Sequence, residues 1–169
     1  MKNPVQDVLD SKALAKANAR FKALPKAKQR VAIAKDVLLQ LKLKKIVATP
    51  GTYCKSSNLS LRQTPDLQKA LLKYKNATCN VCGIGAAFLS MARLGDDAAL
   101  GDDYHHKLQR CFSQRAISNI ETAFEGWYSE TDQKARAFYQ LYPDATDRLT
   151  AIFENIIKHK GNFVPTAKG

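Results

Sequence analysis

The sequence contains four cysteines and three histidines, the residue types that bind zinc and act as nucleophiles. Cys79 and Cys82 are separated by two residues, a spacing with which two thiolates can bind one zinc ion. A tetrahedral site needs two more ligands, and the nearest candidates are His105 and Cys111. That spacing matches no established zinc site. We therefore expect the cysteine pair to be two small apolar residues at the start of a buried helix. A zinc site made of these four residues is the alternative, and no other cofactor is expected.

Nucleophilic catalysis needs a cysteine or serine beside a base, and several pairings of cysteine and histidine are arithmetically possible here. The sequence contains no nucleophile elbow, phosphate-binding loop or zinc-protease motif. We therefore predict no catalytic residue, and the sequence favours a protein that is not an enzyme. A small-ligand site or an enzyme near Cys82, Gly83, Gly85 and the His105–His106 pair remains a third hypothesis, and a polar pocket at that place would favour it.

Positive charge is concentrated in the first half of the chain. The 169 residues include 27 Lys and Arg against 15 Asp and Glu, a formal net charge of +12, and the first 50 residues hold 12 of the former and three of the latter. Such a field raises encounter rates with polyanions and acidic proteins. Phosphate contacts need only accessible Lys and Arg, whereas base readout also needs a recognition helix or stacking aromatic side chains. The basic segment has Phe21 as its only aromatic residue. The predicted site for nucleic acid or an acidic partner is Lys12, Lys16, Arg20, Lys22, Lys26, Lys28, Arg30 and Lys35.

Most of the elements that must position these residues have apolar residues at helical spacing. Residues 79–94 are almost uncharged, which is typical of a helix buried on all sides. Residues 46–54 read as strand, Pro-Gly turn and strand, which predicts a small β-hairpin. We expect a mainly α fold: one domain over residues 1–169, a bundle of six or seven helices around the buried central helix, with that hairpin. The basic helix within residues 1–25 has few apolar residues and is expected to be loosely attached.

Two pairs of segments resemble a family of small phage and prophage proteins that have no assigned activity. The first pair is RVAIAKDVLLQLKLKKIVATPGTYC followed by CNVCGIGAAFLS, and the second is IETAFEG followed by DRLTAIFENIIKHKGNFVP. The resemblance covers residues 29–54, 79–91 and 118–165. It implies expression inside a bacterial host, and small phage proteins of this kind often act by binding host defence proteins, polymerases or nucleases. The family supplies no catalytic residue to transfer.

Together these observations predict a non-enzymatic binding protein that inhibits or modulates a host nucleic-acid-handling or defence complex through its basic N-terminal face. The alternative is a direct, non-specific DNA- or RNA-binding protein. The longest apolar stretches are far too short to cross a bilayer, and the first residues do not resemble a signal peptide. We therefore expect the cytoplasm of the bacterial host as the location, a host protein, nucleoprotein complex or nucleic acid as the partner, and no membrane contact.

Overall fold

The computed structural model describes residues 11–57, 66–73, 77–95, 104–127 and 132–166. These residues confirm the predicted mainly helical class, with eight helices and a small sheet in the described part of the chain. The sequence predicted six or seven helices around a buried central helix, and the structure agrees with that class with one helix more. The helices are α1 Ser11–Ala23, α2 Lys26–Lys42, α3 Leu67–Lys73, α4 Gly83–Leu94, α5 Tyr104–Leu108, α6 Gln114–Glu125, α7 Gln133–Leu141 and α8 Ala145–Lys158.

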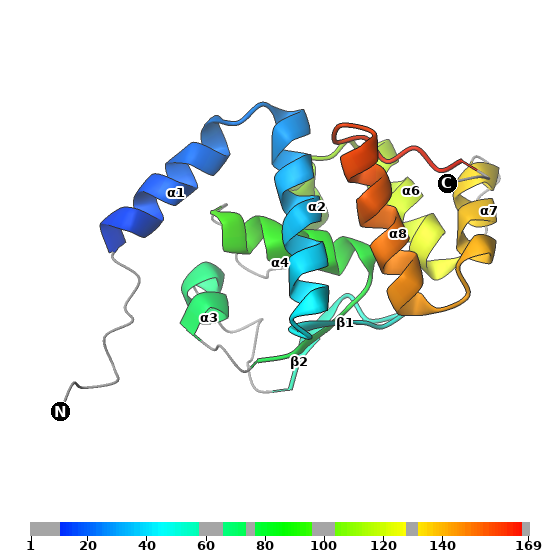
Figure 1. Ribbon diagram of the computed structural model, residues 1–169, viewed down its shortest axis with the longest axis horizontal. Helices are drawn as coiled ribbons and strands as arrows, with labels where there is room; N and C mark the ends of the chain where they lie inside the picture. The colour runs from blue at the N-terminus through cyan, green and yellow to red at the C-terminus, as the bar shows by residue number, and fades with distance from the viewer. Residues whose placement is uncertain (1–10, 58–65, 74–76, 96–103, 128–131, 167–169) are drawn as a thin grey trace.

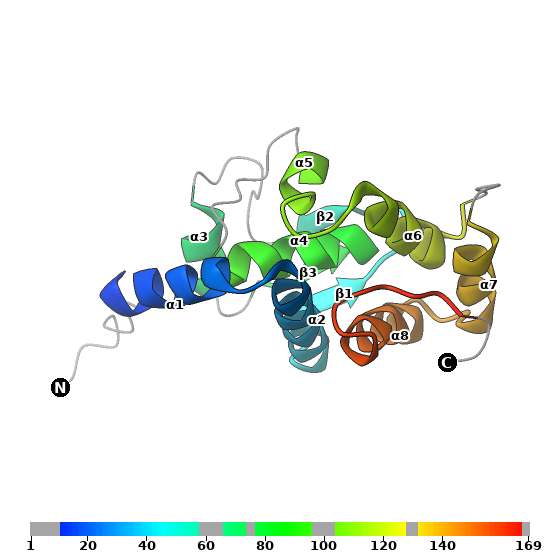
Figure 2. The same cartoon turned by 90° about the horizontal axis from the view of Figure 1, so that it is seen from above.

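The longer helices form two crossed layers (Figures 1 and 2). α2 and α8 pack side by side, and this pair lies across α4 and α6. α7 packs against α6 at one end of the molecule, and α1 and α3 lie at the other end beside α4. The core between the layers is rich in large side chains, and among its fully buried members are Phe88, Phe124, Phe138 and Phe153.

α4 is the buried central helix that the sequence predicts. Every residue from Gly83 to Ala92 is buried. The helix passes so close to the loop at Tyr53 that a Cβ atom added at Gly85 would overlap the backbone carbonyl oxygen of Tyr53. A glycine inside a helix ordinarily costs about 1 kcal/mol against alanine. At Gly85 the close approach of another backbone explains why the smallest residue is required.

The sheet corrects the prediction of a hairpin. The expected strands are present as β1 Ile46–Ala48 and β2 Cys54–Ser56, but they do not pair with each other. A third strand, β3 Cys79–Val81, lies between them, parallel to β1 and antiparallel to β2. The first residues of the expected helix 79–94 thus form a strand, and the helix begins at Gly83. The reason is alternation: Cys79 and Val81 are buried in the core while Asn80 between them is exposed.

Helix α1 contacts the rest of the protein through one face. Phe21 is buried, and the Asn18 and Gln68 side-chain amides exchange two hydrogen bonds of 2.9 and 2.8 Å. Gln68 also donates to the carbonyl oxygen of Arg93 at the end of α4. The N-terminal segment 1–25 is therefore anchored at its described end, and its residues 1–10 lie outside the described part. None of the described helices is both long and apolar enough to cross a membrane.

Candidate functional site

The predicted basic site divides into two rows on two helices. Lys12, Lys16 and Arg20 are exposed and follow one another at intervals of four residues on α1. Residues four apart lie one above the other on a helix, about 6 Å apart along its axis. Phe21 and Asn18 lie on the opposite face, which is the face that contacts the protein. Lys12, Lys16 and Arg20, named here the α1 row, therefore point away from the body.

The second row lies along the outer face of α2. Its exposed members are Lys28, Lys35, Leu39, Lys42 and Leu43, named here the α2 row. The spacing of three, four and seven residues places them on one side of the helix. Ile33, Ala34 and Val37 are completely buried on the other side. The row thus combines lysines with two leucines that are 50% and 52% exposed.

The predicted cations differ in the contacts that they make within the protein. Among the described residues, Lys16, Arg20, Lys28 and Lys35 make no hydrogen bond or ion pair. Lys26 is exposed and its Nζ lies 3.4 Å from the Gln29 side-chain oxygen. Lys22 is exposed on α1, but it lies two residues after Arg20 and therefore on another side of the helix from the α1 row. Four of the predicted positions are therefore cations that a negatively charged partner can reach.

Arg30 is different, because it joins three parts of the chain. Its Nε donates to the carbonyl oxygen of Gly161, and its terminal nitrogens donate to the carbonyl oxygen of Cys111 at 2.8 Å and to the Asn162 side-chain oxygen at 3.3 Å. The guanidinium connects α2 to the turn before α6 and to the segment after α8. Arg30 thus has a structural role in addition to any contact with a partner.

The structure does not gather the four predicted zinc ligands. Cys111 donates to the Gln29 side-chain oxygen at 3.1 Å, and the Cys82 sulfur lies 3.9 Å from the carbonyl oxygen of Tyr53. Cys79 is hydrogen-bonded to Cys54, and His105 lies on the short helix α5. Over the described ranges, no three His, Cys, Asp or Glu side chains form a group that could hold a metal ion.

The cysteines nevertheless have distinct acidities. The hydrogen bond from Cys54 lowers the pKa of Cys79 to about 7, although burial acts in the opposite direction. The same hydrogen bond, together with burial and repulsion between the thiolates, strongly raises the pKa of Cys54. Burial raises the pKa of Cys82 to about 11, even though the backbone amides of Gly85 and Ile84 favour its thiolate. This raised pKa favours the protonated form of the Cys82 thiol at neutral pH, whereas a cysteine nucleophile acts as the thiolate.

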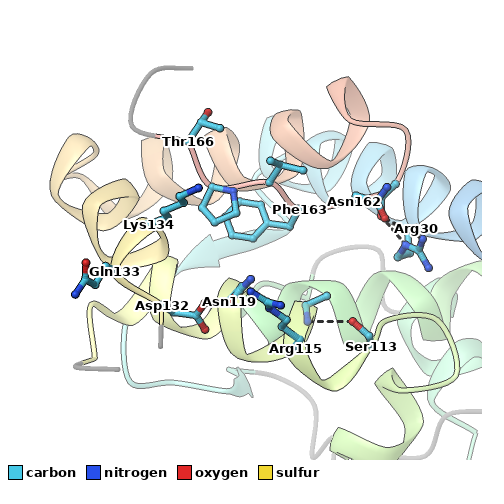
Figure 3. A pocket seen from close by; sticks show the side chains of 14 residues that line it. Arg30, Ser113, Arg115, Asn119, Asp132, Gln133, Lys134, Asn162, Phe163 and Thr166 are labelled. Carbon is cyan, nitrogen blue, oxygen red and sulfur yellow. Dashed lines mark hydrogen bonds between the residues drawn. The ribbon is translucent and has the colours of Figure 1, made fainter. Parts of the chain in front are cut away.

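A cavity of about 880 Å³ opens at the α6–α7 end of the molecule, and the sequence did not predict it (Figure 3). Its walls come from the first turns of α6 and α7, from Arg30 on α2, and from residues 161–166 after α8. Neither Cys82, the central glycines nor the histidine pair of the third hypothesis lines it. Ser113 lines the cavity at the start of α6. Its side chain accepts a hydrogen bond from the Ala116 amide and caps that helix.

Only weak sequence signals pointed to this cavity. The capping serine and the acidic residue Asp132 before α7 mark two helix starts, but four segments distant in the chain make the walls.

Comparison with known proteins adds no relative: no protein-family model matches the sequence, and neither a curated protein nor a solved structure is significantly similar to the chain.

Proposed function

We propose that this protein is a non-enzymatic binding protein that engages a nucleic-acid-handling complex through the α1 and α2 rows. The observation that carries this proposal is the set of exposed cations without acidic partners in the described chain: Lys16, Arg20, Lys28 and Lys35. Their presentation from two successive helices favours a large partner over a small molecule. The choice of a host defence complex as the target rests on the sequence resemblance to phage proteins alone.

The leucines of the α2 row favour a protein component in that complex. Leu39 and Leu43 are each about half exposed, and Lys35 and Lys42 lie beside them on the same face of α2. Val47 on β1, which is 43% exposed, follows four residues after Leu43. Protein interfaces bury apolar anchors within a polar rim, whereas non-specific binding of nucleic acid depends on cations alone. An acidic protein surface therefore matches the α2 row better than bare DNA or RNA does.

Direct binding of nucleic acid is the second candidate, and the α1 row favours it. Three cations at helical spacing, with no exposed aromatic ring between them, suit contacts to phosphates. Such binding would weaken steeply with salt and show little preference for sequence.

The test is a pull-down from bacterial lysate, with and without nuclease, using the wild-type chain and three variants. K16E/R20E removes the charge of the α1 row, L39S/L43S removes the apolar part of the α2 row, and K55E/K158E is a charge-matched control on exposed lysines elsewhere. We expect the wild-type chain to capture a discrete protein partner, with or without nuclease. The amount of partner captured should fall at least tenfold with K16E/R20E and with L39S/L43S, and it should not change with the control.

The other outcomes separate the two candidates. Partners that disappear with nuclease, together with steep salt dependence on bare oligonucleotides, would support direct nucleic-acid binding. Binding that is unchanged by K16E/R20E and by L39S/L43S would show that neither row is the interface, and the proposal would then be wrong.

A further inference from the structure

The cavity at the α6–α7 end has an excess of positive charge. Arg115 on α6 and Lys134 on α7 line it from two walls, and both are exposed with no hydrogen bond or ion pair among the described residues. In the view of Figure 3 these two side chains lie on either side of Phe163. Two cations from different helices are thus available to one ligand in the same hollow.

Asp132, the acidic residue among the described residues that line the cavity, is already engaged. With the Asn119 amide in the orientation that satisfies its neighbours, its nitrogen donates to both carboxylate oxygens of Asp132. Asn119 is only 9% exposed, so this contact is sheltered from solvent. Arg30, the third cation, is held by Gly161, Cys111 and Asn162. Arg115 and Lys134 are consequently the charges that a ligand would meet.

The backbone adds to this positive potential. α6 and α7 both begin at the cavity, and the first amides of a helix have no partner within the helix. In α6 the Ser113 side chain occupies the Ala116 amide. Asp132 precedes α7 but its side chain makes no capping hydrogen bond, because it is turned to Asn119. Amides and partial positive charge at a helix start favour phosphate and carboxylate groups.

Between Asn162 and Thr166, the segment after α8 contributes an apolar part of the wall. Phe163, Val164 and Pro165 form it, and the Phe163 ring is fixed edge-on against Phe138 with the ring centroids 5.4 Å apart. The volume of about 880 Å³ falls within the range of 300–1,000 Å³ that is usual for sites of small ligands and cofactors. A free phosphate ion would leave most of this volume and the apolar wall unused.

We propose that this cavity is a binding site for an organic phosphate with a planar apolar part, the chemistry of a nucleoside monophosphate. Arg115 and Lys134 bind the phosphate, and the wall formed by residues 163–165 contacts the planar part. The site is distinct from the α1 and α2 rows and does not depend on the function proposed for them.

The test is calorimetric titration of the full chain with three probes: adenosine monophosphate, adenosine and inorganic phosphate. R115E/K134E reverses both cations, and K55E/K158E changes the net charge of the chain by the same amount elsewhere. Glutamate in the first turn of a helix is favourable, and residues 115 and 134 both lie in first turns. R115E/K134E should therefore fold with an unchanged thermal midpoint, which a melting curve checks.

We expect the monophosphate to bind at least tenfold more tightly than either adenosine or inorganic phosphate. R115E/K134E should lose at least tenfold of that affinity, and K55E/K158E should keep it. Equal affinity for adenosine and its monophosphate would overturn the role of the two cations, and equal affinity for the monophosphate and inorganic phosphate would overturn that of the apolar wall. No binding of the monophosphate at millimolar concentration, or full binding by R115E/K134E, would overturn the site itself.

Discussion

The two faces of α2 show how differently one helix can be used. On the inner face, Ile33, Ala34 and Val37 are completely buried against α4 and α8. On the outer face, Lys28 and Lys35 have no partner in the described chain. Substitutions on the inner face should therefore change stability, whereas substitutions on the outer face should change only binding. The comparison teaches that burial separates the residues of α2 that hold the fold together from those that are available to a partner.

The largest expected effect lies in the core, at Gly85. Replacing Gly85 with alanine places a Cβ atom against the Tyr53 carbonyl, so the free energy of unfolding should fall by about 3 kcal/mol or more. Alanine in a helix normally stabilises by about 1 kcal/mol, so the sign is reversed here. Urea denaturation checks this change.

Gly83→Ala is the matched control for this prediction. A Cβ atom there would meet the side chains of Ile120 and Phe124 at 3.1 Å, and side chains can move more easily than backbone. It should therefore cost much less than Gly85→Ala. A Gly85→Ala variant as stable as the wild type would contradict the close approach of the two backbones.

Substitution of Arg30 tests whether this partly buried basic residue stabilises the fold. Arg30→Ala removes hydrogen bonds to Gly161, Cys111 and Asn162, and we expect a loss of about 2 kcal/mol in the free energy of unfolding. Lys28→Ala, two residues away on the outer face, should stay within about 0.5 kcal/mol of the wild type. If Arg30→Ala and Lys28→Ala were equally stable, the structural role assigned to Arg30 would be wrong.

Asn18 tests how firmly α1 is attached. Asn18→Ala removes the paired amide hydrogen bonds to Gln68, worth about 1 kcal/mol. Hydrogen exchange of the α1 amides should then become about fivefold faster, while exchange in α8 should not change. Unchanged exchange in α1 would indicate that buried Phe21 and the hydrogen bonds from the Gln29 side chain to the carbonyl oxygens of Phe21 and Lys22 are sufficient to hold the helix.

The smallest effect is expected at Glu121. Burial and the nearby Glu125 raise the pKa of Glu121, and His105 partly opposes this. Because the pKa is higher in the folded state, the stability that Glu121 contributes is present at low pH and is lost as the pH rises through the folded pKa. Glu121→Gln should therefore stabilise the protein at pH 7 by at most about 0.5 kcal/mol. The gain should vanish below pH 4.5, the ordinary value for glutamate; urea denaturation at both pH values checks this.

Periodicity predicted the helical fold because helices α2, α4 and α8 each carry a long apolar pattern. It failed at residues 79–81, because three alternating residues are too few to distinguish a strand from the start of a buried helix. The exposed cations could be predicted from charge alone, but the contacts of Arg30 could not, since its partners lie 81 to 132 residues away in the chain. The cavity was missed for the same reason: its walls come from segments that only the tertiary fold brings together.

The order of strands in the small sheet has a consequence for folding during synthesis. β1 and β2 are both bonded to β3 and not to each other, so neither can complete its pairing until β3 has been made. Ile46 pairs with Cys79, and these residues are 33 positions apart in the chain. At about 5–20 residues per second, a ribosome needs roughly 2–7 s to cover that interval. From the synthesis of β2 until that of β3, the emerging N-terminal half carries two unpaired strands, which makes it a candidate substrate for chaperones.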